Sequence, residues 1–203
     1  MMTVAGRVLG GGAIGLAMAL MNAPRAVATD QFERVDDVYS AGQLRHTPFD
    51  ARIMSISVPE ESNFLEKVFE LTDEAILLNA NIRLWFRTNG VQGLHAADYL
   101  ARMDEVRGRL EALDAPSRVR SVGDLLAESF ALQRRFVNDW YDALQAGQPF
   151  ESQLTDEYAY HEGLHRSHRL LLKTFAELRA LYPDERDSNH RAFHDQLRAV
   201  DFN

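Results

Sequence analysis

The chain of 203 residues carries 22 basic and 30 acidic residues, a formal net charge of −8, and no cysteine. Nucleic acids and anionic membrane surfaces both attract clusters of Lys and Arg, so the acidic balance argues against either as a partner. The absence of cysteine excludes disulfides, thiolate nucleophiles, iron–sulfur ligands and covalent c-type haem. The fold must therefore be held together by packing alone.

Residues 1–28 have the pattern of a cleavable secretory signal peptide. Arg7 provides a basic start, and Val8–Met21 forms an apolar stretch of about 14 residues, which is short for a membrane span. Ala26-Val27-Ala28 then has the small residues that signal peptidase recognises. Cleavage there would leave 175 of the 203 residues, enough for one domain, in the periplasm or outside the cell. The alternative is an uncleaved membrane anchor.

The mature chain is predicted to be helical throughout, except for an irregular N-terminal arm over residues 29–57. Apolar residues recur at helical spacing, and no strand-like alternation of any length occurs. Ser57 and Glu60 form a capping-box pattern with Pro59 between them, which predicts the start of the first helix. That helix is expected to end near Thr88. Further helices are expected over about 94–113, 117–146, 150–182 and 188–200.

Short connections make neighbouring helices antiparallel. The predicted fold is therefore all-α: an up-down-up-down four-helix bundle over residues 58–203, to which the N-terminal arm and a short C-terminal helix are added. The run Leu170-Leu171-Leu172 is wider than one helical face. This run indicates an additional packing neighbour, either the C-terminal helix or a second copy of the chain in a dimer.

His161-Glu162-Gly163-Leu164-His165 matches the H-E-x-x-H motif of zinc peptidases, in which two histidines bind the metal and the glutamate acts as general base. Glu185 follows at a spacing that resembles the third-ligand position of thermolysin-like enzymes. The helical pattern continues to Tyr182, however, and at about 1.5 Å per residue it would place Glu185 roughly 25–30 Å from His165. Arg166 also adds a charge beside the motif. We therefore disfavour a metallopeptidase.

The histidines of the predicted fourth helix are better considered as members of a polar layer. At helical spacing they share one face with apolar residues, so their rings are expected in the core. Buried imidazoles require hydrogen bonds or a metal. Facing helices are expected to bring acidic, amide and hydroxyl groups to the same height, with Ser129 close by. The expected layer contains His161, His165, His168, Glu157, Glu128, Gln133, Thr72 and Asn79.

Three interpretations of this layer stay open. The first is a structural network of hydrogen bonds, and the second is a pocket in which one histidine holds haem or an organic ligand. The third is a metal site for Zn or Cu(II), favoured over Cu(I) because Met54 and Met103 are the only methionines of the mature chain. The candidate metal ligands are His161, His165, His168, Glu157 and Glu128.

Two further histidine patterns are expected to carry no site. A ferritin-like di-iron centre needs two Glu-x-x-His motifs, and Glu162–His165 is the single example. His190 and His194 are expected on the surface of the last helix, with Phe193 and Leu197 pointing inward.

No fingerprint of a catalytic serine, a P-loop or a dinucleotide fold is present. We therefore expect an exported, non-catalytic helical-bundle protein that binds a small ligand or a partner protein. The alternative is a transition-metal-binding protein with its site at the histidine layer. Neither the ligand nor the partner is identified by the sequence.

Overall fold

The computed structural model describes residues 47–54, 58–147 and 161–202. The predicted signal peptide, most of the predicted N-terminal arm and Glu157 lie outside the described residues. Within them every regular element is helical and no strand occurs, which confirms the all-α class. The elements are η2 (Ala51–Ile53), α2 (Pro59–Arg87), α3 (Ala96–Glu111), α4 (Arg120–Gln145), α6 (Glu162–Leu181) and α7 (Asp187–Val200).

The first long helix, α2, begins with proline at its first position, where the missing amide hydrogen costs nothing. Its N-cap is Val58, so the cap predicted at Ser57 is wrong by one residue. At the other end Thr88 is the C-cap, as predicted, and its hydroxyl donates to the Leu84 carbonyl (2.8 Å). Asn89 then adopts a positive φ of 51°, which turns the chain towards α3.

The fourth long helix departs most from the prediction. His161 has an extended backbone (φ −67°, ψ 115°) and is the N-cap of α6, which begins at Glu162. A continuous helix over 150–182 is therefore wrong at His161, while residues 148–160 lie outside the described residues. From Glu162 onwards the helix is unbroken to Leu181, close to the predicted end.

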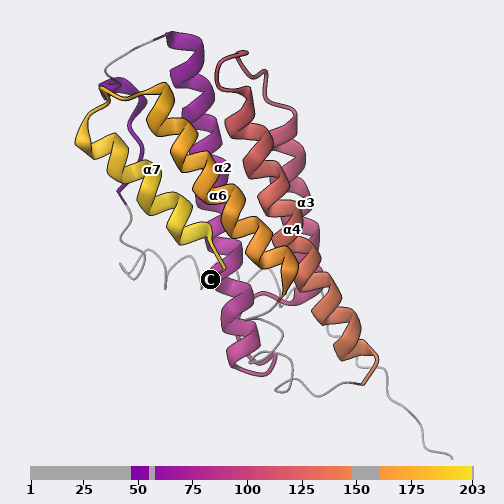
Figure 1. Cartoon of the computed structure of the whole chain (residues 1–203). Coiled ribbons are helices and arrows are strands. Elements are labelled where there is room, and N and C mark those ends of the chain that lie inside the picture. The colour runs from indigo at the N-terminus through magenta and orange to yellow at the C-terminus, as the bar shows by residue number, and fades with distance from the viewer. Residues whose placement is uncertain (1–46, 55–57, 148–160, 203) are drawn as a thin grey trace, which may run out of the picture.

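The α-helices form a closed ring around the core. Each helix packs against the next one along the chain, and α7 packs against both α6 and α2 (Figure 1). The last helix therefore fills the position between α6 and α2. It is also the neighbour that the Leu170-Leu171-Leu172 run indicated, although Leu172 itself stays 55% exposed beside it.

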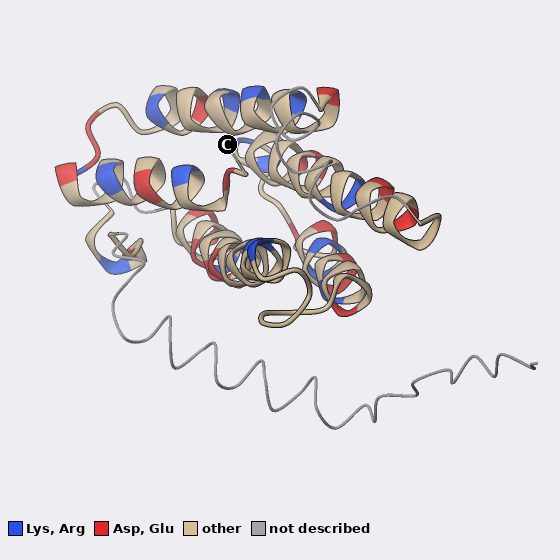
Figure 2. Cartoon of the chain, turned by 90° about the horizontal axis from the view of Figure 1, so that it is seen from below, with Lys and Arg blue, Asp and Glu red and all other residues tan. Residues whose placement is uncertain are grey.

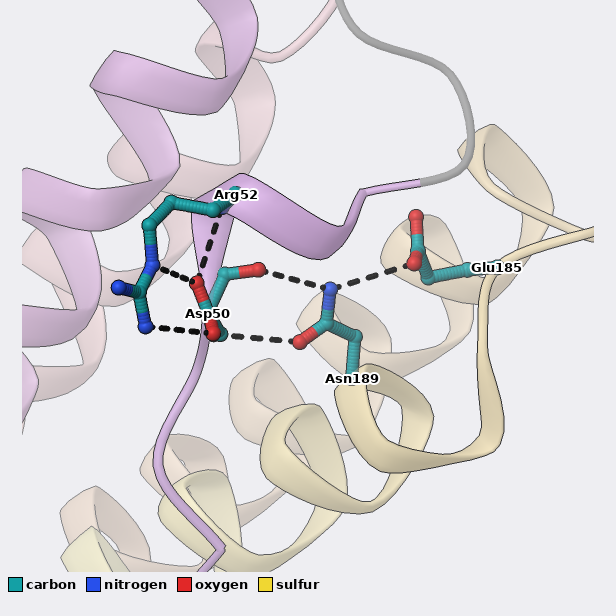
Figure 3. A network of polar contacts seen from close by, with 4 residues as sticks. All are labelled: Asp50, Arg52, Glu185 and Asn189. Carbon is teal, nitrogen blue, oxygen red and sulfur yellow. Dashed lines mark hydrogen bonds and ion pairs between the residues drawn. The ribbon is translucent and has the colours of Figure 1, made fainter.

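The described part of the N-terminal arm lies against α2 and α7. The ring of Phe49 packs against both Phe69 (4.9 Å between centroids) and Phe193 (5.7 Å), which also contact each other (5.5 Å). Asn189 exchanges two hydrogen bonds with the main chain of Asp50, both 3.2 Å, and donates a third to Glu185 (Figure 3). The ring contacts of Phe49 and the hydrogen bonds between the Asn189 side chain and the Asp50 main chain together hold this segment against the bundle.

Candidate functional site

A polar layer crosses the centre of the bundle, as predicted, but amide and hydroxyl groups form it. Asn79 of α2 donates from Nδ2 to Gln133 Oε1 of α4 (2.8 Å). The Tyr99 hydroxyl of α3 donates to Asn79 Oδ1 (2.9 Å). From α6, Ser167 accepts a hydrogen bond from Gln133 Nε2 (3.0 Å). Ser167 thus takes the position that the sequence analysis gave to histidines.

The same layer reaches the end of the chain. Asn79 and Gln133 both donate to the main-chain oxygen of Val200 at the end of α7 (2.7 and 3.1 Å). The Ser129 and Ser167 hydroxyls form a hydrogen bond with each other (2.8 Å). These polar side chains are at most 1% exposed. A buried and paired layer of this kind aligns the five helices with one another and leaves no opening for a ligand.

His161 lies at the start of α6 with its ring turned towards α4. The ring centroid is 5.0 Å from that of Phe136, and Nε2 is 3.7 Å from the Asp139 carboxylate. A Cβ at Gly163 would lie 2.9 Å from the ring, so the glycine of the H-E-x-x-H string provides the space that the ring occupies. Nδ1 is buried and has no hydrogen-bond partner among the described residues.

The other predicted metal ligands have separate surroundings. His165 is exposed on α6. His168 is half-buried, and its Nδ1 lies 2.5 Å from Asp201 Oδ2 just after α7. Glu128 of α4 forms an ion pair with Arg166. Among the described residues no three His, Asp or Glu side chains converge as a metal site requires.

The expectation that three histidines share the core face of one helix is wrong for a geometric reason. The buried face of α6 is not the face that the histidines occupy, since His165 is exposed and His168 only half-buried within the helix, and His161 precedes it. Thr72, also expected in the layer, donates to the Val68 carbonyl of its own helix (2.8 Å). The buried residues of α6 are Leu164, Ser167, Leu171, Thr174 and Leu178.

His194 lies on the surface of α7 as the sequence analysis expected, whereas His190 does not. Glu185 follows the end of the unbroken helix α6 and accepts a hydrogen bond from Asn189. His194 is exposed, and His190 is half-buried with Nε2 2.9 Å from the Tyr182 carbonyl. The inward positions of α7, Phe193 and Leu197, are buried as predicted.

A groove between α6 and α7 is the feature best suited to hold a ligand. Its volume is about 310 Å³, and most of its wall is hydrocarbon. Sequence reasoning did not find it, although the three-leucine run was a signal that this side of α6 has more apolar surface than one neighbour covers. The lining residues are His168, Leu171, Leu172, Phe175, His194, Leu197, Arg198 and Asp201.

The polar side chains of the groove differ in their partners. Asp201 is bonded to His168, as described above, and His194 Nδ1 lies 3.1 Å from Asp195 Oδ1. The hydrogen bond from His194 lowers the pKa of Asp195, so this carboxylate is charged at neutral pH. Arg198 has no ion pair with any described residue.

A second hollow, of about 450 Å³, lies between the start of α2 and the connection from α3 to α4. Its lining mixes charged Glu60, Lys67 and Asp114 with a few apolar groups. It lacks the continuous apolar wall that holds small ligands in most proteins, so the groove between α6 and α7 is the stronger candidate.

Within the described residues, none of the helices combines the length and apolar character needed to cross a membrane. Comparison of the chain with known protein families, with curated proteins and with solved structures gives no match.

Proposed function

We propose that this protein is an exported helical-bundle binding protein whose ligand site is the groove between α6 and α7. The observation that carries the proposal is a concave apolar wall beside Leu172, a large hydrophobic side chain that is 55% exposed. A ligand that covers the Leu172 side chain removes apolar surface from water, which lowers the free energy of the complex. The exported location rests on the signal-peptide pattern of residues 1–28.

The dimensions of the groove favour a small ligand. Its volume of about 310 Å³ is at the lower end of the range usual for ligand pockets. At roughly 30 Å³ for each water-sized group, it has room for about ten non-hydrogen atoms. The lining contains no hydroxyl or thiol among its described residues, so no side-chain nucleophile of that kind faces a ligand. These features support binding without covalent catalysis.

Binding of a neutral probe tests the proposal. Octanamide has ten non-hydrogen atoms, and we expect saturable binding of it to the purified protein by isothermal titration calorimetry at millimolar concentrations. Leu172→Asp should abolish this binding, because a carboxylate would face the hydrocarbon of the probe. Val91→Asp is the matched control, since Val91 is 71% exposed on the loop after α2 and does not line the groove. Absence of binding, or binding that Leu172→Asp leaves unchanged, would contradict the proposal.

Transition-metal binding is the second candidate function, and one observation favours it. The Nδ1 atom of His161 is buried without a hydrogen-bond partner among the described residues, so a metal could satisfy it. The other proposed ligands are His165, His168, Glu128 and Glu157, the last of which lies outside the described residues. Zn or Cu(II) is the metal that this donor set would prefer.

A further inference from the structure

We infer that the ligand of the groove is an apolar carboxylate, with its acid group at Arg198 and its hydrocarbon part along α6. This inference rests on the proposed function, because it names the chemical class that the same groove selects. Three features of the described residues support it: an Arg side chain without an acidic partner, an acid of the lining that is already paired, and the length of the groove along α6.

Arg198 is the charged group of the lining that is left to meet a ligand. The Asp201 carboxylate is held by His168 at 2.5 Å, and its main-chain oxygen accepts a hydrogen bond from Arg83 of α2. The His194 ring is hydrogen-bonded to the Asp195 carboxylate. A guanidinium without an ion pair beside an apolar wall attracts a carboxylate, which can accept two parallel hydrogen bonds from it.

The charges around the groove also favour an anion, although the whole chain has a net charge of −8. Helix α6 contains four basic and two acidic residues, and α7 contains two of each. Figure 2 shows these charges distributed along the helices, with Lys and Arg recurring along α6. Asp201 is the one acidic side chain among the described lining residues, and its pairing with His168 reduces its repulsion of an incoming anion.

The contacts at the two ends of the groove define its length along α6. His168 meets Asp201 at one end, and Phe175 meets His194 at the other, with 5.6 Å between ring centroids. The two helices are therefore antiparallel here, and Arg198 lies about midway along this part of α7, four residues after His194 and three before Asp201. From His168 to Phe175 the groove follows about 10 Å of α6, at 1.5 Å per residue. A short, straight hydrocarbon chain matches this length, and Arg198 is the cation with which its carboxylate would pair.

Octanoate and octanamide test the inference because they have the same size and differ in charge. We expect calorimetry on the purified wild-type protein at neutral pH to show about tenfold tighter binding of octanoate, as one charge-assisted hydrogen bond at a partly exposed site would provide. Arg198→Gln should remove this preference, so that octanoate binds no more tightly than octanamide. Arg191→Gln, an exposed arginine two turns earlier on α7 that does not line the groove, should keep the preference.

The outcomes separate this inference from the proposed function. Equal binding of the two probes to wild type, with loss of both in Leu172→Asp, would overturn the carboxylate inference and keep the groove as a binding site. A preference for octanoate that survives Arg198→Gln would also overturn it. If neither probe binds, the proposed function fails together with the inference.

Discussion

Asn79 and Gln133 share a hydrogen bond of 2.8 Å between their side-chain amides, 54 residues apart in the chain and at the centre of the bundle. Both residues also donate to the carbonyl of Val200. The pair therefore couples α2 and α4 to the last turn of α7. Since Val200 is followed directly by Asp201, the same pair also helps to position one wall of the candidate groove.

The central amide pair predicts a large loss of stability in Asn79→Leu. The substitution leaves the side-chain oxygen of Gln133 and the hydroxyl of Tyr99 without a hydrogen-bond partner in the core. Each unsatisfied group costs roughly 1–3 kcal/mol, so we expect the free energy of unfolding to fall by about 2–6 kcal/mol. Asn81→Leu is the control, because Asn81 is equally buried on α2 but donates only to Leu77 of its own helix. Equal losses in the two variants, measured by urea denaturation, would contradict the assigned role.

We expect substitutions of two glycines, Gly93 in the loop between α2 and α3 and Gly108 inside α3, to have opposite effects on stability. Gly93 has a φ of +89°, and a Cβ there would lie 2.3 Å from the Asn81 carbonyl oxygen, so Gly93→Ala should reduce stability by at least about 2 kcal/mol. Gly108 lies inside α3 with open space around it, and Gly108→Ala should raise stability by about 0.5–1 kcal/mol. Thermal unfolding of both variants would check the signs, and a neutral Gly93→Ala would refute the close approach.

Two tyrosines predict a loss of stability in alkali. Burial raises the pKa of Tyr99, and burial together with a hydrogen bond to Glu61 (2.8 Å) raises that of Tyr182. Because both pKa values are higher in the folded state, their contribution to stability is complete below about pH 10, the ordinary tyrosine pKa, and is lost as the pH rises towards the folded-state values. In Tyr182→Phe this decline should be shallower. Denaturation measured across this pH range would show it, and identical slopes would contradict it.

The metal hypothesis predicts a rise in melting temperature with added metal, and the groove hypothesis predicts none. We expect Zn²⁺, Cu²⁺ and Ni²⁺ to leave the melting temperature unchanged, because His161 and His168 lie apart, near Asp139 and Asp201 respectively. Thermal unfolding near neutral pH with and without each metal measures this. If metal raises the melting temperature of the wild type and not that of His165→Ala, metal binding becomes the better-supported function.

The signal-peptide pattern predicts the N-terminus of the mature protein. Cleavage after Ala28 would make Thr29 the first residue when the protein is produced in a bacterium that exports it. Intact-mass measurement of the periplasmic fraction checks this. Recovery of the full-length chain in the membrane fraction would favour the uncleaved anchor.

Several features of the fold could be predicted from the sequence because they depend on neighbouring residues. The end of α2 near Thr88, the all-α class and the inward positions Phe193 and Leu197 follow from helical spacing and from turn-forming residues. The polar layer was also anticipated in part, since Asn79 and Gln133 occupy inward positions of their helices.

The tertiary structure alone decided which polar groups of α6 enter the core. His161 precedes the helix, which begins at Glu162, and its ring packs against Phe136, while Ser167 on the buried face of α6 is the residue that meets Gln133. The local pattern could not show this, because it depends on Phe136 and Gly163 making room for the ring.

The candidate groove is likewise a product of tertiary packing. Its lining comes from α6 and α7, and the buried hydrogen bond from Asn79 to Val200, 121 residues away, holds α7 to α2. The sequence by itself determined the helical class, the approximate ends of most helices except the start of α6, and the excess of leucine on α6. The packing of α7 between α6 and α2 determined that Leu172 and Arg198 face the same space, because burial of the other apolar residues in one core outweighs the exposure of that leucine.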